Sequence, residues 1–102
     1  MGDFVYNLIG TSGRKCRCRT RPNTWLAHWE RGTGLPLPEK CCAKYCRRYV
    51  EVGAHVRHHG SDGRIPWIVP FCQHHNKRPP SHAIELKNGV TLCGAAMNID
   101  CD

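Results

Sequence analysis

Two pairs of possible metal ligands lie at separate points of this 102-residue chain. Cys42 and Cys46 form the first pair, and Cys72 and His75 form the second, with 25 residues between the pairs. Thiolate sulfur and imidazole nitrogen are preferred zinc ligands, and two such pairs on short turns can surround one tetrahedral ion. The spacing therefore predicts a zinc site made by these four residues.

Two adjacent residues compete for places in this site. Cys41 precedes Cys42 and His74 precedes His75, so the sequence leaves a shift by one residue open in either pair. The alternative for Cys72 is an ordinary buried thiol. A Cys-x-x-His motif directly after an apolar segment with a Pro favours the metal.

A second zinc site is predicted from residues nearer the two ends of the chain. Two cysteines lie one residue apart in a basic segment, a histidine follows on an expected helix, and another cysteine is the last thiol. Together they would supply three thiolates and one imidazole and would join the C-terminal end to the N-terminal arm. In the alternative, the first two are exposed thiols and the histidine is a surface residue. These residues are Cys16, Cys18, His28 and Cys101; Cys41 and Cys93 are then left as small apolar residues.

Eight cysteines and seven histidines are far more than a chain of this length ordinarily contains. They indicate either disulfides in an oxidising compartment or metal in a reducing one. The first nine residues hold an acid, no Lys or Arg and no long apolar run, so we do not expect a signal peptide. No apolar stretch approaches the roughly 20 residues of a membrane span. We therefore expect an intracellular protein of the cytoplasm or nucleus, with two zinc ions, or one at minimum.

The chain is basic, and its charge is unevenly distributed. Residues 1–51 hold ten Lys and Arg against four acids, whereas residues 52–102 hold five against four. An anionic partner, either DNA or RNA or an acidic protein, is therefore expected at the N-terminal half. Candidate nucleic-acid contacts are Arg14, Lys15, Arg17, Arg19, Arg21, Lys44, Arg47 and Arg48.

The pattern of apolar and turn residues predicts a small, metal-stabilised α+β fold with short β-hairpins and one or two short helices. One domain over residues 1–102 is expected, with residues 1–13 as a flexible lead. A helix is predicted from Trp25, capped by Asn23 or Thr24 and ended by Gly32. Strands are predicted over 49–56 and over 67–69, the second stopped by Pro70. Residues 84–86 and 90–92 flank Asn88-Gly89, a strong hairpin signal.

Part of the chain resembles a known family of zinc proteins. Cys42 and Cys46, then Ala54-His55-Val56, then Ile68-Val69-Pro70-Phe71-Cys72 and a final His75-Asn76 resemble an HNH-type treble-clef finger, with its ββα-metal unit. The wider layout resembles a set of small zinc proteins that share a C-x-C, W-x-x-HW, GAHV and IVP-x-C pattern. The resemblance covers roughly residues 14–101 and implies zinc, but the wider set implies no particular activity.

The HNH resemblance implies four catalytic positions, which this chain keeps only in part. His55 stands where a His activates water, but Ala54 stands where a metal-binding acid is often found. Trp67 replaces an expected Asn, and Asn76 replaces the last cation-binding His. A hydrolytic centre needs a cation as well as a base, so we favour a buried structural role for His55 over catalysis.

Three functions follow from these observations. The favoured one is a zinc-stabilised binding module, nucleic-acid-binding or regulatory, with a degenerate HNH-like finger. The second is a protein–protein interaction module, and the third is a metal-dependent nuclease that uses His55. Trp25, Trp29 and Trp67 could stack on unpaired bases, but small domains usually bury their tryptophans, so we expect burial.

Overall fold

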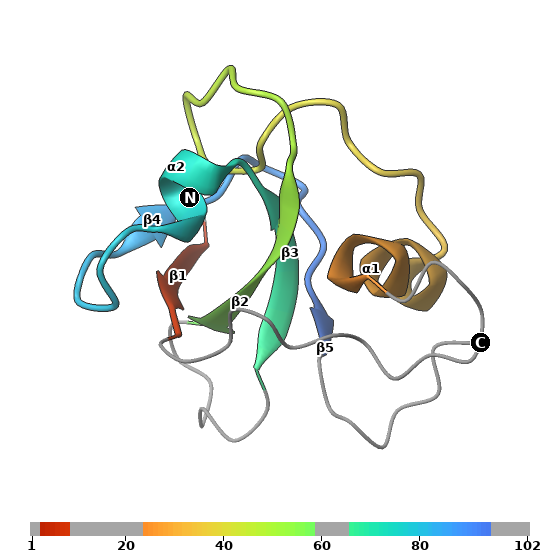
Figure 1. The fold of residues 1–102 in the computed structure, drawn as a ribbon, viewed down its shortest axis with the longest axis horizontal. Helices are drawn as coiled ribbons and strands as arrows, with labels where there is room; N and C mark the ends of the chain where they lie inside the picture. Colours follow the sequence, from red (N-terminus) through yellow and green to blue (C-terminus); the bar gives the residue numbers. More distant parts are fainter. Residues whose placement is uncertain (1–2, 9–23, 59–65, 95–102) are drawn as a thin grey trace.

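The computed structural model describes residues 3–8, 24–58 and 66–94, and within them the chain forms an α+β structure (Figure 1). The strands are β1 (Phe4–Asn7), β2 (Val52–His58), β3 (Trp67–Phe71), β4 (Ile84–Glu85) and β5 (Cys93–Gly94). The helices are α1 (Trp25–Thr33) and α2 (Gln73–Asn76). The predicted α+β class is confirmed. Neither of these helices has the length and apolar character needed to cross a bilayer.

One antiparallel sheet joins all five strands in the order β4-β1-β2-β3-β5. β1 lies inside this sheet, with Val5 opposite His58 of β2 and also opposite Ile84 of β4. The prediction of a flexible lead over residues 1–13 is therefore wrong for Phe4–Asn7. The strand was missed because it has only four residues, which is too short for the alternation of apolar and polar side chains to be clear.

The two faces of the sheet pack against different partners, because successive side chains of a strand point to opposite sides. Ala54, Val56, Val69 and Phe71 point into the larger core, together with Val5. We call this side the metal face, because the cysteines of the site described below pack there. Ile68 points to the other side, the helix face, where α1 lies. Figure 1 shows α1 on one side of the β2–β3 pair and α2 on the other.

Helix α1 begins and ends close to the predicted positions. The Thr24 hydroxyl accepts a hydrogen bond from the Ala27 amide, which confirms Thr24 as the cap. The helix ends at Gly34, whose φ of 71° is the left-handed conformation that suits a C-terminal glycine, rather than at Gly32. Trp25 and Trp29 are buried as expected, whereas Trp67 is half-buried.

Pro70 does not stop the second central strand but lies within it. The Pro70 carbonyl accepts a hydrogen bond from the Cys42 amide, so this edge of Pro70 points away from β2. The N–H that proline lacks would point to the same side, where β5 does not extend past Ile68. The sheet therefore loses no ladder hydrogen bond, and the strand continues to Phe71.

The Asn88-Gly89 turn forms without the predicted hairpin. Gly89 has a φ of 80° while Asn88 keeps a negative φ, and the Val90 amide donates to the Lys87 carbonyl at 3.4 Å. Positive φ at the second central residue alone is the type II pattern, whereas tight hairpins use turns whose twist matches the strands. Residues 90–92, predicted as the second strand of the hairpin, form no strand, and the next strand, β5, begins at Cys93. β4 pairs with β1 at one edge of the sheet, and β5 pairs with β3 at the other.

Candidate metal centre

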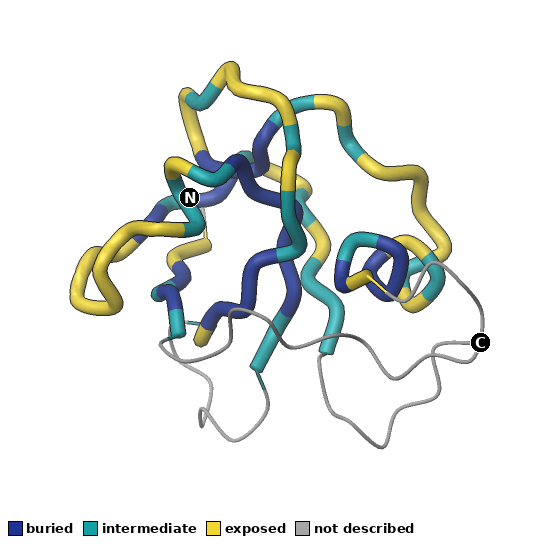
Figure 2. The backbone as a smooth tube through the Cα atoms, in the orientation of Figure 1, coloured by how far each residue is buried: buried dark blue, intermediate teal, exposed yellow. Residues whose placement is uncertain are grey.

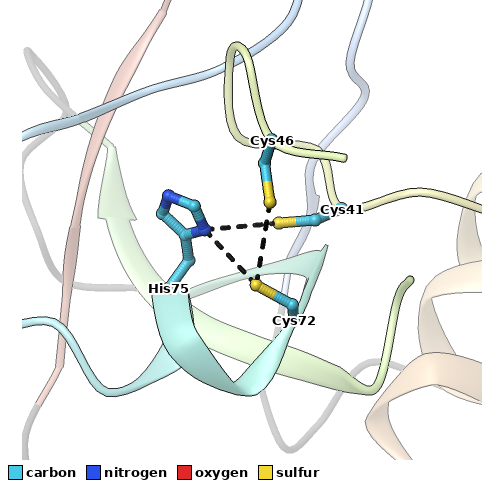
Figure 3. A group of neighbouring side chains, drawn as sticks. All are labelled: Cys41, Cys46, Cys72 and His75. Carbon is cyan, nitrogen blue, oxygen red and sulfur yellow. Dashed lines mark hydrogen bonds between the residues drawn. The ribbon is translucent and has the colours of Figure 1, made fainter. Parts of the chain in front are cut away.

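Three cysteines and one histidine converge beside the metal face of the sheet. The Sγ atoms of Cys41, Cys46 and Cys72 and one ring nitrogen of His75 all lie within 4.8 Å of one another. Figure 3 shows the three sulfurs and the His75 Nδ1 pointing toward one centre, with the other ring nitrogen turned away. Cys41 and Cys72 are fully buried, and Cys46 is partly buried.

The separations between these atoms match a tetrahedral zinc site. With Zn–S bonds of about 2.3 Å and Zn–N bonds of about 2.0–2.1 Å, tetrahedral geometry puts two sulfurs about 3.8 Å apart and sulfur and nitrogen about 3.6 Å apart. The Cys46 and Cys72 sulfurs are 3.9 Å apart. The His75 Nδ1 lies 3.3 Å from the Cys72 sulfur and 3.7 Å from the Cys41 sulfur. The four residues therefore fit one zinc ion.

Cys41, and not Cys42, belongs to this cluster, which corrects the predicted ligand set. The Cys41 amide donates to the Arg48 carbonyl, whereas the Cys42 amide donates to the Pro70 carbonyl. Adjacent residues of an extended segment point in opposite directions, so only one of the two thiols can face the cluster. Cys42 packs into the core instead, where burial raises the pKa of its thiol to about 11.

A tight turn brings Cys46 back toward Cys41. We call residues 41–46 the knuckle loop. The Cys46 amide donates to the Ala43 carbonyl, and Tyr45 before it has a φ of 67°, the left-handed conformation that ordinarily favours glycine. The Lys44 amide donates to the Glu85 carbonyl, so the loop is also joined to β4. Backbone hydrogen bonds therefore position this ligand pair from two sides.

Helix α2 supplies the other two ligands and is held at both ends by side chains from the sheet. Cys72 precedes the helix and His75 lies within it, one turn later. At its start, the Glu51 carboxylate accepts a hydrogen bond from the Gln73 amide at 3.1 Å. At its end, the Asn7 amide donates to the carbonyls of His75 at 2.7 Å and Arg78 at 3.0 Å.

The electrostatics of the thiols differ across the cluster. Burial raises the pKa of the Cys41 thiol to about 12, so this group gives up its proton only when a cation takes the proton's place. Partial burial also acts to raise the pKa of Cys46. Hydrogen bonds from the Arg48 backbone and from the side chains of Cys41 and Cys72 outweigh it, so the pKa of Cys46 is lowered overall.

The surroundings of His75 favour its neutral form, which is the form that binds a metal ion. Burial lowers its pKa below the ordinary value, and the nearby charges of Arg78, His74 and Arg48 lower it further. His74, the competing ligand of the sequence analysis, is exposed, and its ring meets the His75 ring edge-on at 5.3 Å. The structure therefore places His75 in the cluster and His74 outside it.

The second predicted site falls mostly on residues that the structure does not describe. Cys16, Cys18 and Cys101 lie outside the described ranges. His28 is described and is buried on α1, with its Nε2 2.8 Å from the Gly94 carbonyl oxygen. His28 is thus not the surface residue of the alternative interpretation. A second ion stays a prediction.

His55 lies on the helix face, on the side of the sheet opposite to the four clustered ligands. It is 6% exposed, and the ring centroids of His55 and Trp25 are 4.5 Å apart in an edge-on contact. The predicted burial of His55 is confirmed. A general base must reach a water molecule, and the low exposure of His55 limits such contact.

The predicted nucleic-acid contacts are described only around the knuckle loop. Arg14, Lys15, Arg17, Arg19 and Arg21 lie outside the described residues. Lys44 forms an ion pair with Glu85 at 3.0 Å, and this contact raises the Lys44 pKa. Arg47 and Arg48 are exposed directly after the last knuckle cysteine.

Sequence analysis missed one residue that matters for the metal centre. Asn7 is 4% exposed and contacts the end of α2 from a strand 68 residues earlier in the chain. Nothing in the local pattern shows such a distant partner. The available signal was the spacing of Asn7 from Val5: residues two apart in a strand share a face, so Asn7 would be buried beside Val5 and would need a hydrogen-bond partner.

Comparisons of the chain with protein-family models, with curated proteins and with solved structures gave no match. The geometry therefore carries the assignment alone. In its described ranges, the chain is a small α+β protein with one candidate metal site, Cys41, Cys46, Cys72 and His75.

The choice of Cys41 over Cys42 can be tested by exchanging each for a residue that cannot bind zinc. We expect Cys41→Ser to contain one zinc fewer per chain than the wild type, because a thiolate ligand is lost. The matched control, Cys42→Ala, should keep the wild-type zinc content and lose only packing free energy, about 1 kcal/mol. Metal analysis of the purified proteins measures both, and the reverse result would contradict the assignment.

Zinc binding should release protons in a number set by these ligands. In a chain with Cys16, Cys18 and Cys101 each changed to Ser, we expect about three protons per zinc near pH 7.5, one from each cluster thiol. His75 should add almost none, because this pH lies above the ordinary histidine pKa of about 6.5 and the pKa of His75 is lowered further. Calorimetry in buffers of different ionisation enthalpy measures the number, and a value of about four would contradict this ligand set.

The same groups fix the sign of the pH dependence. The unfolded chain takes up a proton at His75 below its ordinary pKa of about 6.5, whereas the folded chain does not until a lower pH. Stability should therefore fall as the pH drops below about 6.5, and zinc should leave in the same direction as the thiolates take up protons. Rising zinc retention on acidification would contradict this.

Asn7 is expected to position the metal helix. Asn7→Ala removes both hydrogen bonds to the end of α2, so we expect about 1–3 kcal/mol of lost stability and roughly 10- to 100-fold weaker zinc binding. Phe4→Thr is the control, because Phe4 lies on the same strand but is 40% exposed. Competition with a chelator measures the affinity. Equal zinc affinity of Asn7→Ala and Phe4→Thr would show that Asn7 does not act on the site.

Proposed function

We propose that this chain is a zinc-stabilised binding module whose partner is nucleic acid. The observation that carries the proposal is the cluster of Cys41, Cys46, Cys72 and His75, whose separations fit one tetrahedral ion. Three thiolates and one imidazole fill all four positions of such an ion. A catalytic zinc keeps one position for water or substrate, so the donor set favours a structural zinc.

The order of elements supports a treble-clef-like arrangement of this module. A ligand pair on the knuckle loop comes first, the β2–β3 pair follows, and the second ligand pair lies at the start of α2 and within it. The ion in such an arrangement joins the loop before the two strands to the helix after them. The proposed zinc therefore has the role of connecting segments that the small core alone holds weakly.

The charge of the chain supports an anionic partner. The formal net charge is +7, and the basic excess lies in residues 1–51. Within the described residues, Arg47 and Arg48 are exposed beside the knuckle loop and present this charge to solvent. Such residues bind phosphate through long-range attraction and the release of counterions. An acidic protein would meet the same charge, and the experiment below separates the two.

Binding without hydrolysis is the activity that the site residues favour. His55 is the candidate base, but it is buried against Trp25 on the face away from the clustered ligands. Ala54, beside it in sequence, cannot ligate a cation and points into the core. A nuclease needs both a base and a cation at the phosphate, so this pair of residues supports a binding role.

The proposal predicts nucleic-acid binding that weakens with salt and depends on the charge near the knuckle loop. We expect Arg47→Gln to bind a labelled oligonucleotide several-fold more weakly than the wild type and with a shallower salt dependence. Arg57→Gln is the matched control, because it removes the same charge from an exposed position on the helix face. Fluorescence anisotropy at several salt concentrations measures both. An absence of binding to DNA and RNA at low salt would contradict the proposal and favour a protein partner.

A further inference from the structure

Two exposed tyrosines lie in the knuckle loop or directly after it. Tyr45 is 87% exposed and Tyr49 is 61% exposed, whereas aromatic side chains of small domains are usually buried. In Figure 2 the tube between the knuckle loop and β2 is mainly exposed where it projects beyond the sheet. We name Lys40, Lys44, Tyr45, Arg47, Arg48 and Tyr49 the knuckle surface.

Tyr45 occupies a backbone position that a tyrosine does not favour. Its φ of 67° is left-handed, and for a residue with a side chain this conformation costs about 1–2 kcal/mol compared with glycine. Glycine at this position would form the same turn without strain. The tyrosine ring is almost entirely in solvent, so core packing does not offset the strain. Residues held in such sparsely populated backbone conformations cluster at functional sites such as ligand-contacting surfaces.

Each tyrosine is paired with a lysine of the knuckle surface. The Lys40 ammonium lies 3.6 Å from the centre of the Tyr49 ring, and the Lys44 ammonium lies 5.3 Å from the centre of the Tyr45 ring. Lys40 and Tyr49 are also partners in an isolated β-bridge, so the backbone holds this pair together. The knuckle surface therefore places positive charge beside aromatic rings.

This combination selects among anionic partners. Within the described part of the chain, Lys44 is ion-paired with Glu85, which leaves Lys40, Arg47 and Arg48 to meet phosphates. A duplex offers phosphates but hides the faces of its bases, whereas a single strand offers both. Exposed aromatic rings next to basic side chains are the usual elements of single-strand binding, in which bases stack on the rings.

We infer that the knuckle surface binds single-stranded nucleic acid, with unpaired bases stacked on Tyr45 and Tyr49 and phosphates held by Lys40, Arg47 and Arg48. This inference rests on the proposed nucleic-acid function and gives it a strand preference and a surface. The zinc ion acts on binding indirectly, because Cys41 and Cys46 hold the knuckle loop, which carries Tyr45 and is followed three residues later by Tyr49.

Tyr45→Gly tests the stacking without weakening the fold. Glycine relieves the left-handed strain, so the unfolding midpoint and zinc content should equal or exceed those of the wild type. Loss of one stacked base should weaken binding of the zinc-loaded protein to a labelled 12-nucleotide single strand by roughly 5- to 150-fold. Binding to a duplex of the same sequence should change little. Fluorescence anisotropy at fixed salt measures the affinity of the wild type, of Tyr45→Gly and of two control variants, Tyr45→Phe and Phe4→Leu.

Two control variants separate stacking from other effects. Tyr45→Phe keeps the ring and should bind like the wild type; if it loses as much affinity as Tyr45→Gly, the hydroxyl and not the ring face is responsible, and stacking is wrong. Phe4→Leu removes an exposed aromatic ring from the helix face and should have no effect.

The outcomes also separate the inference from the function on which it rests. If the wild type binds single strand and duplex equally and Tyr45→Gly matches it, the inference is overturned while nucleic-acid binding stands. If the wild type binds neither at low salt, the proposed function fails, and the inference fails with it. A single-strand preference that disappears in Tyr45→Gly and persists in Tyr45→Phe supports both.

Discussion

The convergence of three sulfurs and one imidazole nitrogen at a single point is the constraint on which the rest of the structure depends. The two segments that supply them, the knuckle loop and α2, add only small buried side chains to the core, namely Cys41, Cys42 and Ala43 of the knuckle loop. Burial raises the pKa of the Cys41 thiol to about 12, so without a metal ion this thiol stays protonated. A bound metal ion would replace the proton and stabilise the buried thiolate, and its binding free energy would stabilise the packing of the knuckle loop and α2 against the sheet.

The sheet divides the molecule between two tasks. Its metal face carries the cluster. Three of the groups that hold the segments bearing the ligands are the Asn7 side chain of β1, the Glu51 side chain before β2 and the Glu85 carbonyl of β4. Its helix face carries α1, whose approach is so close that an added Cβ at Gly53 would lie 2.8 Å from the Trp25 backbone. His28 and Trp29 join α1 to the chain near β5 through hydrogen bonds to the carbonyls of Gly94 and Thr91. One face therefore supports the ligand geometry, while the other supplies ordinary packing.

Sequence reasoning succeeded where the physics is local and failed where it depends on distant partners. Thr24 as a helix cap, the α+β class and the existence of a Cys and His cluster all follow from residue types within one turn or one short motif. The identity of the first ligand does not, because spacing cannot tell which of two adjacent thiols, Cys41 or Cys42, faces the second ligand pair. The Asn88-Gly89 hairpin was predicted wrongly for a related reason: β4 pairs with β1, residues 90–92 form no strand, and β5 pairs with β3. Strand β1 has too few residues to show its own period, and Asn7 contacts a helix far along the chain.

The hydrogen bonds of Asn7 also bear on the order in which the chain folds. The ligands span residues 41 to 75, whereas the contacts of Asn7 with the end of α2 join residues 68 and 71 positions apart. Closing the shorter loop, from residue 41 to residue 75, costs less chain entropy, and binding of the ion would stabilise the closed loop directly. The knuckle loop, the β2–β3 pair and α2 can therefore assemble around zinc as a nucleus, with β1 added later. The metal would then set the rate of folding as well as its equilibrium. Until β1 pairs with β2, the nucleus would expose the open edge of β2, an unpaired strand prone to association.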